Sequence, residues 1–145
     1  MKPTFELLVV DDNPGDVALV TEALAGSKNP IQISNVRDGA EALAFLHRRE
    51  KYANAVRPHL VLLDLNLPKR DGLSVLAAMK AGPDLRRIPV VIFSTSELRK
   101  DIVRGYEMGA NCYVRKPGNL TEFFSAVKSI EEFWFGSAVL PPQGE

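Results

Sequence analysis

Short runs of hydrophobic residues alternate with amphipathic segments along most of the chain. The hydrophobic runs are bounded by glycine, proline or polar residues, and runs of this length are typical of strands. They predict strands at residues 5–10, 31–36, 59–64, 90–94 and 112–115. The third run is apolar at consecutive rather than alternate positions, which indicates a strand buried on both faces of a sheet.

The segments between these runs carry signals for the starts and ends of helices. Asn13 followed by Pro14 predicts the start of the first helix, and Asp38 begins the second with a capping-box pattern. A third helix is expected from about residue 73 to the pair Gly82-Pro83, a fourth from about 97 to 109, and a fifth from Asn119.

The regular alternation of strands and helices predicts a parallel sheet with helices on both faces. Right-handed crossovers favour a doubly wound, flavodoxin-like α/β fold: five strands in the order 2-1-3-4-5, flanked by five helices. The first and third strands are then neighbours, and ligands bind beyond their carboxyl ends. A length of 145 residues fits one such domain.

Composition narrows the set of partners. The 18 basic and 18 acidic residues give a formal net charge of zero, which provides no general attraction to nucleic acid or to a membrane. The single cysteine, Cys112, excludes an internal disulfide and is compatible with a reducing compartment. The first apolar run is too short for a signal peptide or a membrane span, so we expect a cytoplasmic protein.

Charged and hydroxyl side chains follow four of the predicted strands. Asp11 and Asp12 end the first strand and Asp64 ends the third, so three carboxylates are expected at one edge of the sheet. Their mutual repulsion favours a bound cation, and Mg²⁺ prefers such oxygen ligands. Ser94 ends the fourth strand and Lys116 follows the fifth, where a hydroxyl and an ammonium suit phosphoryl oxygens.

Each of these residues also has an ordinary explanation when it is taken alone. A strand-end aspartate is more often a turn or cap residue, and Asp12 is well placed to cap the first helix. Lys116 alone is typical of a solvated lysine, and Ser94 of a hydrogen-bonded core hydroxyl. The functional interpretation therefore depends on the whole set.

The ordered set resembles the receiver domain of two-component response regulators, over nearly the whole chain. The matching segments are Asp11-Asp12, the run from Asp64 to Gly72 that includes Pro68, then Ser94, and Lys116-Pro117. The resemblance implies that Asp64 accepts a phosphoryl group from the phosphohistidine of a sensor histidine kinase. Such a protein is a phosphoacceptor that catalyses only its own phosphorylation and slow dephosphorylation, not an enzyme acting on other substrates.

The resemblance also implies roles for individual residues. Asp12, Asp64 and the backbone carbonyl of Asn66 would bind Mg²⁺ directly, and Asp11 would bind it through water. Ser94 would donate a hydrogen bond to the phosphoryl group and Lys116 would pair with it, with a cis peptide bond between Lys116 and Pro117. Tyr113 matches an aromatic switch that turns inward and alters the surface of the fourth helix, fifth strand and fifth helix. Thr95 stands where many receivers have alanine or glycine, and it narrows access to Asp64.

A narrower group of receivers fits residues 68–72, 93–96, 111–113, 133–135 and 140–141. These segments are similar to the stand-alone regulators of bacterial and cyanobacterial phytochromes, which form dimers. The similarity implies a red/far-red light-sensing kinase as phosphodonor. The aromatic residues at 133–135 end the last helix on several faces, and we expect Phe133 and Phe135 to lie off its core face. We therefore expect a receiver domain at 1–135, an extension at 136–145 that serves as a dimer arm, and a homodimer.

Two other classes of function remain open at this point. A Mg²⁺-dependent phosphatase of the haloacid dehalogenase type also uses an aspartyl nucleophile, but it usually has a second acid where this chain has Asn66. A receiver that acts only as a dimeric interaction module, independent of phosphorylation, is the second alternative.

Overall fold

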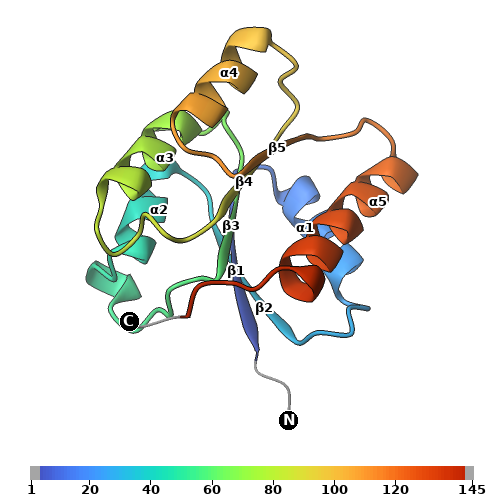
Figure 1. The fold of residues 1–145 in the computed structure, drawn as a ribbon, viewed down its shortest axis with the longest axis horizontal. Coiled ribbons are helices and arrows are strands. Elements are labelled where there is room, and N and C mark those ends of the chain that lie inside the picture. Colours follow the sequence, from blue (N-terminus) through green and yellow to red (C-terminus); the bar gives the residue numbers. More distant parts are fainter. Residues whose placement is uncertain (1–3, 143–145) are drawn as a thin grey trace.

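The computed structural model describes residues 4–142 and contains a five-stranded parallel sheet between two layers of helices (Figure 1). In chain order the elements are β1 (Phe5–Val10), α1 (Pro14–Leu24), β2 (Ile31–Val36), α2 (Gly39–Leu46), the short 3₁₀ helix η1 (Glu50–Tyr52), β3 (Leu60–Leu63), α3 (Gly72–Ala81), β4 (Val90–Ser94), α4 (Arg99–Glu107), β5 (Cys112–Arg115), α5 (Leu120–Glu131) and the π-helical segment η2 (Glu132–Ser137). Four strands have the predicted bounds, and β3 is one residue shorter at each end than 59–64.

The strands pair in the order β2-β1-β3-β4-β5, which confirms the predicted doubly wound, flavodoxin-like fold. Helices α1 and α5 cover one face, and α2, α3 and α4 cover the other (Figure 1). The strand order reverses between β1 and β3, where Val10 is aligned with Leu63. The residues that follow them, Asp11 and Asp64, therefore leave the sheet side by side.

Alternate residues of the central strands pack into two separate cores. In β1, Leu8 and Val10 pack on the side of α2 and α3, whereas Leu7 and Val9 pack on the side of α1 and α5. Every residue of β3 and β4 is buried. Burial on both faces explains why these strands are apolar at consecutive positions.

The ends of the helices follow their capping residues. The side chains of Asn13, Asp38, Asp71 and Asn119 each accept a hydrogen bond from the backbone N–H three residues on, at the starts of α1, α2, α3 and α5. Helix α4 has no side-chain cap, and it is shorter than the predicted span of 97–109. It ends before Gly109, whose left-handed φ of 106° closes the turn into β5.

The end of the last helix differs from the prediction. Phe135 is only 4% exposed and stacks against Phe5 with ring centroids 4.7 Å apart, so the expectation that it lies off the core face is wrong. Phe133 is 54% exposed, as expected, and contacts Trp134 edge to face. The cause is the π-helical geometry of η2, in which Ala138 N–H donates to the Phe133 carbonyl five residues back. The wider π-helical turn places Phe135 on the core face of the helix, where a regular α-helix would place its neighbour Trp134.

Replacing Phe135 with alanine is expected to lower the free energy of unfolding by about 3–5 kcal/mol, because the lost ring leaves a cavity beside Phe5. Truncation of Leu120 to alanine, at an exposed position of α5, is the control, with an expected loss of about 1 kcal/mol or less. Urea denaturation of both variants measures the difference. Equal losses would contradict the burial of Phe135.

Candidate functional site

Three carboxylates meet at the switch point of the sheet. Asp11 and Asp12 follow β1, Asp64 follows β3, and each contributes an oxygen so that the three oxygens lie within 4.8 Å of one another. Asp11 and Asp64 are buried, at 4% and 8% exposed, and Asp12 is the most exposed of the three. Their position is the one at which open α/β sheets bind ligands.

Backbone N–H groups orient the two buried carboxylates. Asp11 Oδ1 accepts from the N–H of Asn13 at 2.9 Å, and Asp64 Oδ1 accepts from the N–H of Asn66 at 3.2 Å. The cap of α1 is Asn13, whose side chain accepts from the N–H of Asp16. Asp12 therefore does not cap this helix, and the ordinary explanation for that residue does not hold.

Lys116 crosses from the end of β5 to the acidic cluster. Its Nζ lies 2.7 Å from Asp11 Oδ2, 2.8 Å from Asp16 Oδ2 and 3.1 Å from Asp64 Oδ2, and its side chain is 4% exposed. The three carboxylates match the three N–H donors of an ammonium group. Lys116 is thus a buried ion-pair residue, and this excludes its alternative interpretation as a solvated surface lysine.

Asp16 is the residue of this site that the sequence analysis missed. It lies in the first turn of α1, four residues after Asp12. An acid in a first helical turn is ordinarily explained by the helix dipole, so its type and position gave no sign of a second role. Its nearness in the chain to Asp11 and Asp12 did not by itself indicate that its side chain turns toward the end of β5.

The charges of the cluster do not balance. Four carboxylates, those of Asp11, Asp12, Asp16 and Asp64, face the single ammonium of Lys116. Burial raises the pKa of Asp11 above its ordinary value, although the hydrogen bond from Lys116 opposes this shift. Burial would lower the pKa of Lys116, but its hydrogen bonds to Asp11 and Asp16 raise it above the ordinary value, so the ammonium stays charged. The excess of oxygen donors and negative charge fits a hard divalent cation such as Mg²⁺.

The two residues at the end of β4 differ in their surroundings. Ser94 is fully buried, and its carbonyl accepts from the N–H of Lys116 at 2.8 Å. It lies two residues after Ile92, which is aligned with Leu63, so Ser94 stands at the same edge of the sheet as Asp64. Thr95 is exposed.

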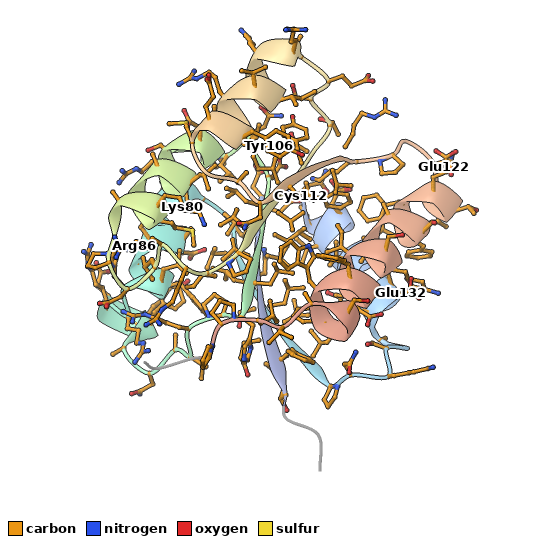
Figure 2. The ribbon with its side chains drawn as sticks, in the orientation of Figure 1. Lys80, Arg86, Tyr106, Cys112, Glu122 and Glu132 are labelled. Atoms are coloured by element: carbon orange, nitrogen blue, oxygen red, sulfur yellow. The ribbon has the colours of Figure 1, made fainter. Side chains whose placement is uncertain are left out.

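Tyr113 connects this edge of the sheet to α4. Its hydroxyl donates to the carbonyl of Ser96 at 2.9 Å, and its backbone N–H donates to the hydroxyl of Tyr106 at 3.1 Å. Tyr106 projects from α4 toward β5 (Figure 2). The side chain of Ser96 in turn donates to Asp101 in α4 at 2.6 Å. The segment that follows Ser94 is therefore tied to both Tyr113 and α4.

The expected cis bond before Pro117 is not found. The described residues 4–142 contain no cis peptide bond, so the bond between Lys116 and Pro117 is trans, the default for a peptide bond before proline. Lys116 reaches the carboxylates in this conformation.

A parallel sheet in this order, with acids at its switch point and a lysine from its last strand, defines an α/β protein of the receiver type. The sequence model of the response regulator receiver domain matches residues 7–128, and the chain belongs to this family. No helix in residues 4–142 is long and apolar enough to cross a membrane.

Relatives extend over nearly the full length of the chain. It is 45% identical over 139 residues to the response regulator Rcp1 of Synechocystis, covering 96% of this chain and 95% of Rcp1. The structure is similar to that of phosphorylated RcpA, a cyanobacterial phytochrome response regulator, with a TM-score of 0.94, 50% identity and coverage of 97% and 100%. It is also similar to Mn²⁺-bound Rcp1, with a TM-score of 0.92, 45% identity and coverage of 95% and 99%.

Replacing Lys116 with methionine is expected to destabilise the metal-free protein by about 3–5 kcal/mol, since Asp11 and Asp64 would remain buried without their cation. Saturating Mg²⁺ should restore most of this loss, because it supplies positive charge at the same oxygens. Chemical denaturation with and without Mg²⁺ measures both effects. Lys128→Met, at an exposed position of α5, is the matched control; equal stability of the two variants would contradict the importance of the buried ion pairs.

Proposed function

We propose that this protein is a response regulator that accepts a phosphoryl group on Asp64 from a sensor histidine kinase, in a reaction that depends on Mg²⁺. The observation that carries the proposal is the position of Asp64, a buried carboxylate whose Oδ2 lies 3.1 Å from Lys116 Nζ and which has an oxygen within 4.8 Å of oxygens of Asp11 and Asp12. A nucleophile, a cation site and a fixed ammonium are the parts that phosphoryl transfer needs.

In this reaction a carboxylate oxygen of Asp64 forms a bond to phosphorus while the bond from phosphorus to the imidazole nitrogen of the kinase breaks. Mg²⁺ bound at this site would supply positive charge to the phosphoryl oxygens. Asp12, Asp64 and the carbonyl of Asn66 would hold the metal directly, with Asp11 acting through water. Lys116 is already at Asp64, so a short movement of its Nζ brings it to a phosphoryl oxygen.

The proposed output is a change on the surface of α4, β5 and α5. When a phosphoryl group is present on Asp64, the Ser94 hydroxyl donates a hydrogen bond to it. Ser96 lies two residues after Ser94, and its carbonyl accepts from the Tyr113 hydroxyl. A shift of this segment therefore changes the position of Tyr113 and its contact with α4. The exposed side chain of Thr95 restricts the access of a phosphodonor to Asp64.

The proposed phosphodonor is a phytochrome-type histidine kinase, of the bacterial or cyanobacterial kind. RcpA is described as a cyanobacterial phytochrome response regulator. A further structural relative, from R. palustris, acts in red light signaling and is 33% identical, with a TM-score of 0.88 and coverage of 96% of this chain and 99% of that one. Similarity over the whole length of such proteins supports this class of partner and a cytoplasmic location.

We also propose a homodimer, with residues 1–135 as the receiver domain and residues 136–145 as its arm. The support is the exposure of two apolar side chains near the C-terminal end of the described residues, Phe133 at 54% and Val139 at 98%. Phe135 does not take part, because it is buried against Phe5.

The phosphatase alternative is not favoured by the geometry. The residue two positions after Asp64 is Asn66, an exposed amide that neither gains nor loses a proton near neutral pH and so cannot serve as a general acid or base. Hydrolysis of small phosphate esters over many turnovers would support that alternative, and we expect none.

Asp64→Asn is expected to abolish labelling by acetyl phosphate or by a kinase, because an amide cannot form the acyl phosphate. Labelling of the unaltered protein should also stop in excess chelator. Phosphate-affinity electrophoresis measures both results, and Asp84→Asn, at an exposed acid outside the cluster, should label normally. Labelling retained by Asp64→Asn would remove Asp64 from its role and would leave the phosphorylation-independent interaction module as the better function.

Phe133→Ser is expected to shift the protein from dimer to monomer, since it removes an exposed apolar ring from the proposed interface. Sedimentation velocity at several concentrations measures the mass. Leu120→Ser removes a side chain of similar exposure, 55%, from the other end of α5 and should leave the dimer intact. A dimer of unchanged affinity in Phe133→Ser would exclude this surface as the interface.

A further inference from the structure

A second pocket lies at the end of the sheet opposite the acidic cluster. It has a volume of about 350 Å³, which is within the range of small-molecule sites. Its lining comes from the loops before β3 and β4, the turn after α2, and the C-terminal segment, which crosses the base of the sheet to reach it (Figure 1). The lining residues are Arg48, Arg57, Pro58, His59, Asp84, Arg87, Ile88, Pro89, Pro141 and Pro142.

Basic side chains outnumber acidic ones among the described residues that line this pocket, although the net charge of the chain is zero. Within residues 4–142 the lining contains three arginines, at positions 48, 57 and 87, and one acid, Asp84. The arginines come from three separate loops, so no single amphipathic element accounts for their meeting. Guanidinium groups bind phosphate and carboxylate oxygens in pairs, which makes such a cluster suited to an anion.

His59 adds a neutral hydrogen-bond donor. Its Nδ1 accepts from the backbone N–H of Glu6 at 2.9 Å, and its ring lies edge to face against Phe5. Burial lowers its pKa, which favours the neutral ring. Because Nδ1 is the acceptor, the ring proton is on Nε2, which is the nitrogen that can donate to a ligand.

Arg48 occupies a backbone position where arginine is unfavourable. It follows the end of α2 with a left-handed φ of 57°, and the N–H groups of Arg48 and Arg49 donate to the carbonyls of Phe45 and Ala44. This is a Schellman motif, in which glycine or asparagine is the usual residue at the left-handed position. An arginine there costs conformational free energy that glycine would avoid, and its side chain supplies one of the three charges of the pocket.

The remaining walls suit the organic part of a ligand. Arg57 is oriented by a hydrogen bond from its Nε to the carbonyl of Leu46 at 3.3 Å. Pro58, Ile88 and Pro89 are buried residues of the floor, and Pro141 with Pro142 forms one wall. The pocket therefore combines apolar surface with cationic groups, the usual composition of sites for small organic anions.

We propose that this pocket binds a small organic dianion, a phosphate monoester or a dicarboxylate, through Arg48, Arg87 and His59, with the organic group against the prolines. This site is separate from the phosphoryl site at Asp64, and the proposal does not depend on the proposed function.

Titration of the protein followed by NMR tests the site, after a chelating resin has removed divalent metals so that the acidic cluster cannot recruit the ligand through a metal. The probes are inorganic phosphate, phenyl phosphate and phthalate. We expect saturable shifts centred on the amides of Arg48, His59 and Arg87, with tighter binding of an aromatic dianion than of inorganic phosphate. Tighter phenyl phosphate identifies the phosphate class, and tighter phthalate the dicarboxylate class. Shifts without saturation, or equal affinity for all three probes, would overturn the proposal.

Two pairs of variants make the test specific. Arg87→Ala should weaken binding about tenfold, the loss of one charge-assisted hydrogen bond, whereas Arg86→Ala, in the same loop but outside the lining, should not. Arg86 lies at the outer edge of this loop (Figure 2). Equal losses in both variants would mean a diffuse basic surface and would overturn the site.

Arg48→Gly should weaken binding while the protein becomes no less stable, since glycine suits the left-handed position. Glu50→Gly, at another left-handed residue with φ of 54° outside the pocket, is the control and should keep full affinity. Unchanged affinity in Arg48→Gly would exclude Arg48 as a ligand residue and overturn the proposal as stated.

Discussion

The structure depends most on the contact between one ammonium group and the carboxylates around it. Lys116 comes from the end of β5, and its three partners come from the ends of β1 and β3 and from the first turn of α1. One buried cation therefore joins β1, α1, β3 and β5, and its contact with Asp11 spans 105 residues of the chain. Its positive charge offsets the cost of burying the carboxylates of Asp11 and Asp64. Because one ammonium cannot neutralise four acids, the remaining negative charge attracts a divalent cation. The cluster therefore has two roles: its contacts hold the strand ends together, and the same contacts hold the proposed phosphoacceptor in position.

The route from Asp64 to the surface is short. Ser94, Ser96 and Tyr113 follow one another from the sheet edge to α4, and each contact is a backbone or hydroxyl hydrogen bond rather than a rigid packed interface. Gly105 of α4 permits this approach, because a Cβ there would come within 2.7 Å of Ile92 and 3.4 Å of the Tyr113 ring. In the proposed switch, a movement of Ser94 would be transmitted through these contacts to the face of α4 and β5.

The sequence predicted the strands, four of the helix starts and the strand order, since buried parallel strands and side-chain caps are local signals. The meeting of Asp11, Asp12 and Asp64 followed from that order alone. Three features could not be predicted from local sequence patterns. Asp16 joins the cluster only because Lys116 arrives from a strand 100 residues later. Phe135 enters the core only because η2 adopts a π-helical turn, which no periodicity of the sequence indicates. The pocket of arginines arises from three loops that the topology brings together.

The acidic cluster and the arginine pocket lie at opposite ends of the same sheet, so charge is separated along the strands although the net charge of the chain is zero. A protein without net charge has no long-range attraction to a charged partner as a whole, but the field of that partner acts in opposite directions on separated charges and so favours one orientation. An approaching surface that is positive near its own reactive group would turn the Asp64 end toward itself before contact. Salt should then slow productive encounters through loss of orientation, even though the overall charge is zero.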